Sequence, residues 1–244
     1  MKNILLLLTF SLILTFSTQA YVLNDLKQSS MNDLIAFQLN ENDIKILKHM
    51  REEEKLARDV YDYFYIKYEL PIFDNISNAE QVHMDRVLAV LTKNGIKDPA
   101  SSEPGKFNNI ELQQLYYDLI AQGDKSVVEA LKVGATIEDV DIYDLMKFSK
   151  ETKNPVILNI FKNLTCGSRN HMRAFIGILK THDVTYTPKY ITAKLFSKII
   201  KGKHEKCGLK NGTRMGEKKG RGRGQGQGSG RGKGQGRGNR GNRF

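Results

Sequence analysis

The stretch Asn-Ala-Glu-Gln-Val-His-Met-Asp-Arg-Val-Leu-Ala-Val-Leu, residues 78–91, decides the fold of this chain. Its apolar residues recur every three or four positions, which is the spacing of an amphipathic helix. Glu80 and His83 lie three residues apart and therefore on one face, and that face continues into Val87 and Val90. A carboxylate and an imidazole on a buried stripe are costly unless they are paired, hydrogen-bonded or bound to a metal. Glu-x-x-His is common by chance, but helix bundles also use it to hold carboxylate-bridged metals, so the rest of the chain decides its meaning.

A long helix is expected before this stretch, from capping residues near Asn40 to Tyr68, where a proline follows. Its inner stripe advances in steps of three and four residues and carries Glu54 near its middle. The neighbouring Glu52 and Glu53 fall on other faces. Glu54 can belong to an acidic, solvated run or be a buried carboxylate, and the apolar residues on both sides of it favour burial.

The helix that carries Glu80 is expected to start at a cap on Ser77 or Asn78, after a short proline-containing connection, and to end at Gly95. Residues 96–109 contain two prolines and a pair of serines, which indicates an ordered loop. A shorter helix is expected over residues 111–121.

Two further long helices repeat the pattern of a polar side chain inside an apolar stripe. The helix expected over residues 125–149 carries Glu138, with Asp141 one turn later, and the helix that opens at Asn154-Pro155 carries His171. Glu138 lies in a locally acidic run that could be solvated or could start a new helix, and a lone histidine on an apolar face is usually a core residue. Four such helices are harder to explain in this way.

The sequence between residues 40 and 182 contains no alternating strand pattern of any length. We therefore expect an all-α domain. Residues 21–200 are enough for one domain with a proper core.

The assembled pattern is a Glu on the first long helix, Glu-x-x-His on the second, a Glu on the third and a His on the fourth, and it resembles the ferritin-like superfamily. The segments MREEEKLARDVY (50–61), LPIF (70–73) and GSRNH (167–171) more closely resemble the domain-of-unknown-function 2202 family, over residues 43–182. The first segment is also similar to the metal-binding helix of rubrerythrin-type proteins. The family is placed among ferritin-like proteins, so the resemblance implies a ferritin-like four-helix bundle.

The resemblance implies metal ligands on each of the four helices. These are Glu54, Glu80, His83, Glu138 and His171. The fourth helix departs from the superfamily because Ser168 stands where a carboxylate is expected, so a bridging carboxylate is missing unless Asp141 replaces it. The function that the resemblance implies is a metal protein with a di-iron or di-manganese site that reacts with oxygen or peroxide, with zinc as a further candidate metal.

The alternative is a non-catalytic helical bundle for binding or structure, and Ser168 favours it. In that case the same carboxylates and histidines would form a buried hydrogen-bonded network, which is stable only if every member is satisfied.

The N-terminus has the pattern of a secretory signal peptide over residues 1–20. Met1-Lys2-Asn3 is basic, residues 4–16 are apolar, and small residues lead up to Ala20. The mature chain would then begin at Tyr21 with a leader up to residue 42, and the protein would be secreted or periplasmic. An uncleaved membrane anchor is the alternative, although the apolar run is short for a membrane span.

The net charge of +11 comes from the C-terminal part of the chain. Residues 201–244 hold 14 of the 38 Lys and Arg residues, two of the 27 Asp and Glu residues and 15 of the 21 glycines. After a connecting segment, 183–212, we expect a disordered Gly/Arg-rich tail over residues 213–244. Such a tail can bind nucleic acid, a membrane surface or another anionic polymer through its charge, or it can serve solubility alone. The sequence also leaves open whether the bundle forms a homodimer.

The chain has two cysteines, Cys166 in an expected helix and Cys207 at the start of the glycine-rich region. Export permits a disulfide, but two cysteines do not make a disulfide framework. Two free thiols are favoured over a Cys166–Cys207 bond.

Overall fold

The computed structural model describes residues 38–208, and that part of the chain is all-helical, without a strand. The all-α prediction is therefore confirmed. The predicted signal peptide, most of the leader and the basic tail fall in residues 1–37 and 209–244, outside the described range. The helices are α2 (Glu41–Tyr68), α3 (Pro71–Lys93), α4 (Ile110–Gly123), α5 (Val127–Glu151), α6 (Pro155–Thr181) and α7 (Ala193–Lys201).

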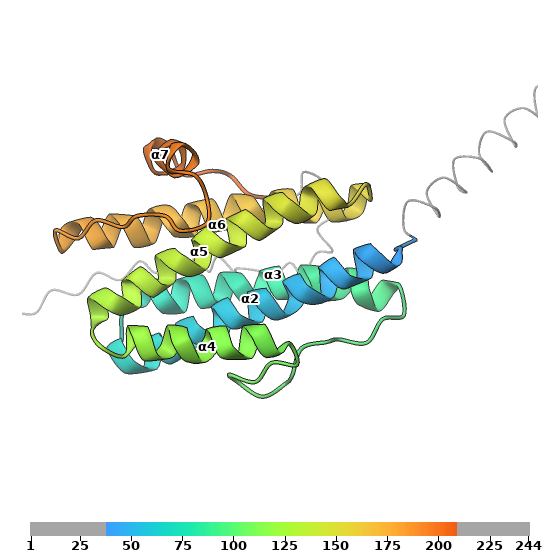
Figure 1. Ribbon diagram of the computed structural model, residues 1–244, viewed down its shortest axis with the longest axis horizontal. Helices are drawn as coiled ribbons and strands as arrows, with labels where there is room; N and C mark the ends of the chain where they lie inside the picture. The colour runs from blue at the N-terminus through green and yellow to red at the C-terminus, as the bar shows by residue number, and fades with distance from the viewer. Residues whose placement is uncertain (1–37, 209–244) are drawn as a thin grey trace, which may run out of the picture. The chain divides into compact units, whose positions relative to one another are not determined.

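The long helices form two closely packed antiparallel pairs, α2 with α3 and α5 with α6 (Figure 1). The pairs meet through contacts of α2 with α5 and of α3 with α6. Helix α4 packs against α2 and α5. It returns the chain along the pair α2 and α3, so α5 starts at the end of the molecule opposite to the end of α3 (Figure 1). The inner faces of all four long helices thereby converge on one interior.

The start of α3 differs from the expectation of a cap at Ser77 or Asn78. The helix begins at Pro71, whose fixed φ suits the first helical position and whose missing N–H is not needed there. Glu69 ends α2 in the left-handed conformation, with a φ of 52°. The connection therefore consists of Glu69 and Leu70 alone, and residues 72–77 lengthen α3 by more than one turn.

The core consists of two apolar clusters at different heights along the helices. One is centred on aromatic residues that include Tyr61, Phe73 and Phe175. The other contains aliphatic residues that include Met50 and Val87, together with Phe161. On α2, Glu54 lies between the two clusters, so a layer of polar side chains divides the apolar interior.

The middle of α2 is buried on every side, and this corrects the expectation that only one face carrying Glu54 would be enclosed. The loop after α3 covers the opposite face. Arg51 forms a 2.7 Å ion pair with Asp98, and Glu52 accepts a hydrogen bond of 2.7 Å from the backbone N–H of Asn108. Charged side chains that the helical period places away from the core thus hold this loop in place.

The segment after α6 folds back onto α6, which the sequence did not predict. Asp139 of α5 accepts hydrogen bonds from the backbone N–H groups of residues 189–191, and α7 packs against α6. Beyond α7, Glu205 accepts a 2.8 Å hydrogen bond from Arg169.

Cys207 is thereby brought to Cys166, and the two form a disulfide. The expectation of two free thiols is wrong, because the return of the chain onto α6 is not visible in the sequence. The described part of the chain has no free cysteine, and none of its helices is both long enough and apolar enough to cross a membrane.

Opening the disulfide is expected to destabilise the domain. The bond joins residues that are 41 positions apart, and closing a loop of that size lowers the entropy of the unfolded chain enough to stabilise the fold by about 2–4 kcal/mol. Urea unfolding of the Cys207→Ser variant is expected to show this loss. A reductant is expected to reproduce the loss in the wild type and to leave the variant unchanged, and equal stability of variant and wild type would contradict the prediction.

Candidate metal centre

The polar layer contains side chains from all four long helices. Glu54 comes from α2, Glu80 and His83 from α3, Glu138 and Asp141 from α5, and Ser168 and His171 from α6. The carboxylates are at most 7% exposed, and the His171 side chain is 12% exposed. The six residues predicted as ligands therefore lie in one layer, although their role as ligands remains a prediction.

Glu80 is at the centre of the layer, because its two carboxylate oxygens face different histidines. Oε2 lies 2.6 Å from Nδ1 of His83, and Oε1 lies 2.8 Å from Nδ1 of His171. Two groups of possible ligands share this carboxylate: Glu80 with Glu54 and His83, and Glu80 with Glu138 and His171. Within each group the ligand atoms lie within 4.8 Å of one another, which is close enough for one metal ion to contact all three.

The two histidines occupy matching positions on the two sides of Glu80. His83 Nδ1 also lies 3.2 Å from Oε2 of Glu54, and His171 Nδ1 lies 3.5 Å from Oε2 of Glu138. Their rings are stacked, with centroids 5.7 Å apart. Nδ1 of each imidazole therefore faces two carboxylates. One is that of Glu80, which both histidines share, and the other belongs to Glu54 or Glu138.

Gly167 makes room for the His83 ring. A methyl group at this position would lie 2.7 Å from Cε1 and Nε2 of His83. The close approach of the α6 backbone to this ring therefore requires glycine. The sequence motif that contains Gly167 showed the family resemblance, but it gave no indication of this contact.

Tyr61 anchors Glu138. Its buried hydroxyl donates a 2.6 Å hydrogen bond to Glu138 Oε1, so that Oε2 remains on the side of His171. Tyr65, the neighbouring tyrosine on α2, is 40% exposed. Only the first of these two tyrosines belongs to the centre.

Asp141 lies beside the two groups of ligands and belongs to neither of them. The hydroxyl of Ser168 lies within hydrogen-bond distance of Asp141 Oδ2 and of the backbone carbonyl of Leu164, and its single proton is shared between these two acceptors. Burial raises the pKa of Asp141, and the charges of Glu54, Glu53 and Glu138 raise it further. Asp141 is the residue expected to replace the missing carboxylate. It is thus hydrogen-bonded to Ser168, which occupies the position of that carboxylate.

Protons satisfy much of the centre when no metal is bound. Burial raises the pKa of Glu54 to about 8. Burial alone would lower the pKa of His83, but the charges of Glu80 and Glu54 raise it to about 10. Burial would raise the pKa of Glu80, but His171 and His83 hold it below its usual range. Burial would likewise lower the pKa of His171, but the charges of Glu80 and Glu138 raise it. The metal-free centre therefore keeps Glu80 as an anion between two protonated imidazoles.

Three buried atoms of the centre have no hydrogen-bond partner: Glu54 Oε1, Asp141 Oδ1 and His171 Nδ1. His171 Nδ1 is close to Glu80, but its geometry does not make a hydrogen bond. Unpartnered buried polar atoms are rare in native proteins and indicate an ion or water that completes them. Four carboxylates and two neutral imidazoles carry four negative charges, which two divalent cations would balance. Carboxylate and imidazole donors suit iron, manganese and zinc, so these residues fit a metal centre.

A family model described as an uncharacterized protein domain, DUF2202, matches residues 43–203. Because this match covers more than half of the chain, the chain belongs to the DUF2202 family, as its sequence motifs predicted. It is 48% identical over 169 residues to the uncharacterized protein MJ0754 of Methanocaldococcus jannaschii, across 69% of this chain and 91% of that protein. The crystal structure of the hypothetical protein MJ0754 from Methanococcus jannaschii superposes with a TM-score of 0.68 at 48% identity, covering 69% of this chain and 97% of that one.

The contact between Gly167 and His83 predicts opposite effects of alanine at two glycines of α6. Gly167→Ala is expected to destabilise the fold by about 1–3 kcal/mol, as overpacking of a filled core does. Gly177→Ala is the matched control, because a methyl group there meets nothing within 4 Å, and it is expected to stabilise the helix by about 0.5–1 kcal/mol. Urea unfolding measures both changes, and an equal response of the two variants would rule out the close packing of His83.

The metal-free protein is expected to lose stability as the pH rises from 6.5 to 8. In this interval Glu54 and His83 keep protons in the folded chain that they release in the unfolded chain, because their folded pKa values are raised to about 8 and about 10. Each such proton lowers the free energy of unfolding by up to about 1.4 kcal/mol per pH unit. A divalent metal bound by these residues would displace the protons, so a stabilising effect of added metal is expected to grow over the same interval.

Chemical unfolding at several pH values, with EDTA and with Mn²⁺, tests this dependence. Stability that rises with pH in EDTA would contradict the protonated centre.

Proposed function

We propose that the chain is an exported, ferritin-like metal protein in which α2, α3, α5 and α6 form a four-helix bundle around a pair of iron or manganese ions. The observation that carries the proposal is the carboxylate of Glu80, which lies between two imidazoles and is shared by two groups of ligand atoms. In ferritin-like dinuclear sites, carboxylates and histidines on four helices project inward to hold the metals.

The ligands of one ion would come from α2 and α3, and those of the other ion from α3, α5 and α6. Glu54 and His83 would hold one ion, Glu138 and His171 would hold the other, and Glu80 would be a ligand of both. Such a pair of ions would supply one-electron steps in reactions with oxygen or peroxide. The chain itself keeps bulk water out, because apolar clusters lie on both sides of the layer, and the hydroxyl of Tyr61 keeps Glu138 oriented.

Asp141 would supply the fourth carboxylate in place of the one that Ser168 replaces. Two observations support this role: Oδ1 of Asp141 has no partner, while Oδ2 is held by the Ser168 hydroxyl. A residue that orients a ligand by a hydrogen bond typically contributes about 10–100-fold to metal affinity. Ser168 is thus the positioning residue for Asp141.

The disulfide supports the proposal that the protein is exported. Disulfides persist in oxidising compartments and are rare in reducing ones, and Cys166 is bonded to Cys207. The pattern of residues 1–20, which is typical of a secretory signal peptide, gives an independent reason. The cationic sequence of residues 213–244 would attach the protein to an anionic polymer, nucleic acid or membrane surface by charge.

A non-catalytic bundle is the second candidate, and Ser168 is the observation that favours it. Proton sharing around Glu80 would then stabilise the fold without metal. The buried oxygens of Glu54 and Asp141 that lack partners count against this candidate, because a buried polar network is stable only when it is fully satisfied.

Metal analysis of the full chain tests the proposal. Protein purified without chelator and reconstituted anaerobically with Fe²⁺ or Mn²⁺ is expected to hold two ions per chain at the centre, as Glu80 is shared by two ligand groups. Glu80→Gln is expected to lose both ions, because it removes the shared anion. Glu129→Gln is the matched control, since Glu129 pairs with Lys132 at the surface of the same bundle.

Circular dichroism checks that both variants remain helical. If the wild type holds no metal at the centre after reconstitution, the dinuclear proposal is wrong, and the non-catalytic candidate takes its place. If metal is bound but peroxide and oxygen are not consumed faster than in the Glu80→Gln variant, the redox part of the proposal is wrong.

A further inference from the structure

A second cluster of ligand atoms lies between α2 and α5, nearer to the surface than the centre. It consists of His49 and Glu53 of α2 and Asp144 of α5, whose ligand atoms lie within 4.8 Å of one another. His49 Nε2 is 3.5 Å from Glu53 Oε2 and 3.8 Å from Asp144 Oδ2. The sequence analysis did not identify any of the three as a ligand.

Glu53 is the residue that points to a bound ion. Its side chain is only 5% exposed, yet neither of its carboxylate oxygens has a hydrogen-bond partner. The contact with His49 is longer than an ordinary hydrogen bond. A buried carboxylate without partners is costly, and here it is directed at an imidazole and a second carboxylate. These three donors are the kind that bind divalent transition metals.

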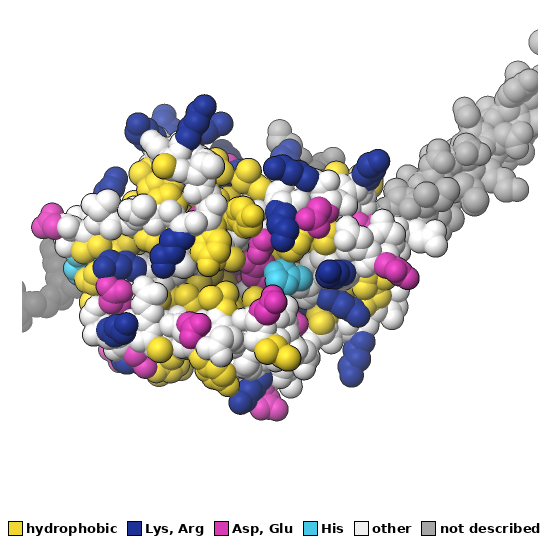
Figure 2. Space-filling model, in the orientation of Figure 1, with side chains coloured by type: hydrophobic (Ala, Val, Ile, Leu, Met, Phe, Trp, Pro, Cys, Tyr) yellow, Lys and Arg dark blue, Asp and Glu magenta, His cyan; other side chains and the backbone are white. Residues whose placement is uncertain are grey.

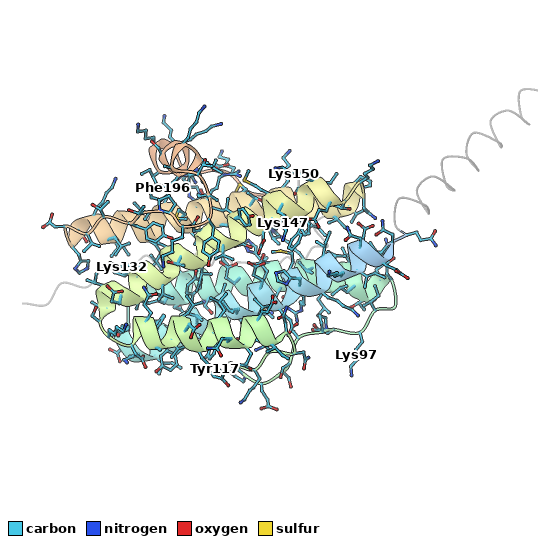
Figure 3. All side chains as sticks on the ribbon, in the orientation of Figure 1. Lys97, Tyr117, Lys132, Lys147, Lys150 and Phe196 are labelled. Atoms are coloured by element: carbon cyan, nitrogen blue, oxygen red, sulfur yellow. A yellow bond between two sulfur atoms is a disulfide. The ribbon has the colours of Figure 1, made fainter. Side chains whose placement is uncertain are left out.

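The cluster is reached from solvent. The side chains of His49 and Asp144 are 26% and 18% exposed, so exposure decreases from His49 inward to Glu53. Figure 2 shows a histidine with acidic side chains beside it on the face where α5 passes α2. Lys147, labelled in Figure 3, lies 3.8 Å from Asp144 Oδ1 and is 49% exposed. The lysine therefore approaches the oxygen of Asp144 that does not face His49.

The cluster also adjoins the centre along both helices that form it. On α2, Glu53 is followed directly by Glu54, and on α5, Asp141 precedes Asp144 by three residues and therefore lies on the same side of the helix. Carboxylates thus continue from the partly exposed cluster to Asp141 and Glu54, each of which has an oxygen without a hydrogen-bond partner.

We propose that His49, Glu53 and Asp144 form a second divalent-metal site, which binds an ion from solvent and passes it to the buried centre. Binding at this site stands by itself, whereas passage to the centre rests on the function proposed above. One imidazole and two carboxylates at a partly exposed position leave room for water on the ion. The ion therefore keeps part of its water and can exchange, whereas the ligands of the centre are more deeply buried and share the carboxylate of Glu80.

Co²⁺ binding to the full chain tests the site, because the visible absorption of Co²⁺ reports its ligands. In a Glu80→Gln/His83→Ala variant, in which the centre is disabled, we expect one Co²⁺ per chain to remain, and we expect it to be lost when His49→Ala is added. His182→Ala replaces an exposed histidine outside both clusters and is the matched control, expected to leave this Co²⁺ in place.

The rate of loading tests the passage. With an intact centre, stopped-flow absorption is expected to show that His49→Ala fills the centre about tenfold or more slowly but to the same final amount. His182→Ala is expected to load at the wild-type rate. Unchanged loading in His49→Ala would overturn the passage.

The two proposals fail in different ways. If the wild type binds metal at the centre but the centre-disabled variant binds none, the second site is wrong and the proposed function stands. If the centre-disabled variant holds one Co²⁺ that depends on His49 but the wild type holds no more, the second site stands and the dinuclear centre is wrong.

Discussion

Buried negative charge without enough partners is the constraint on which the rest of this structure depends. The Glu80 carboxylate is 2% exposed, and three further carboxylates from α2 and α5 share its layer. Such a layer is stable in an apolar interior only if positive charge accompanies it. Protons on His83 and His171 provide part of that charge, but Oε1 of Glu54 and Oδ1 of Asp141 remain without partners. A pair of divalent cations would complete both the charge and the coordination.

Contacts around the polar layer hold its buried side chains in place. Gly167 allows the α6 backbone to approach the His83 ring, Tyr61 fixes Glu138, and the Ser168 hydroxyl binds Asp141. All three contacts join different helices. Two of them, Gly167 with His83 and Tyr61 with Glu138, also join the two helix pairs, so the polar layer is itself a packing contact between the pairs. The disulfide and the ion pairs of Glu205 add a brace on the outer side of α6, the helix that carries His171.

The sequence predicted the helical class and the residues of the central layer because both depend on local periodicity. A stripe that advances by three or four residues places Glu54, Glu80, Glu138 and His171 on inner faces, and the structure brings these faces together. The family membership also followed from short motifs. What the layer binds is not decided by periodicity, and the dinuclear site and the ferritin-like assignment stay proposals.

The features that sequence reasoning missed depend on contacts between distant segments or on one residue with two roles. Pro71 was assigned only to the end of α2, although it also begins α3. The Cys166–Cys207 bond requires the chain to return over α6, and no local pattern shows that return. Glu53 was placed off the inner stripe, but α5 brings Asp144 to it and to His49. Burial on more than one face of a helix cannot be recognised from a single hydrophobic period.

The most direct test of this account is anomalous X-ray diffraction from crystals of the full chain grown without chelator and soaked with Mn²⁺ or Fe²⁺, with data collected on both sides of the metal absorption edge. The account predicts two anomalous peaks on opposite sides of the Glu80 carboxylate, one near His83 and one near His171. An ordered Glu80 without an anomalous peak beside it would contradict the central claim that this buried layer is a metal centre.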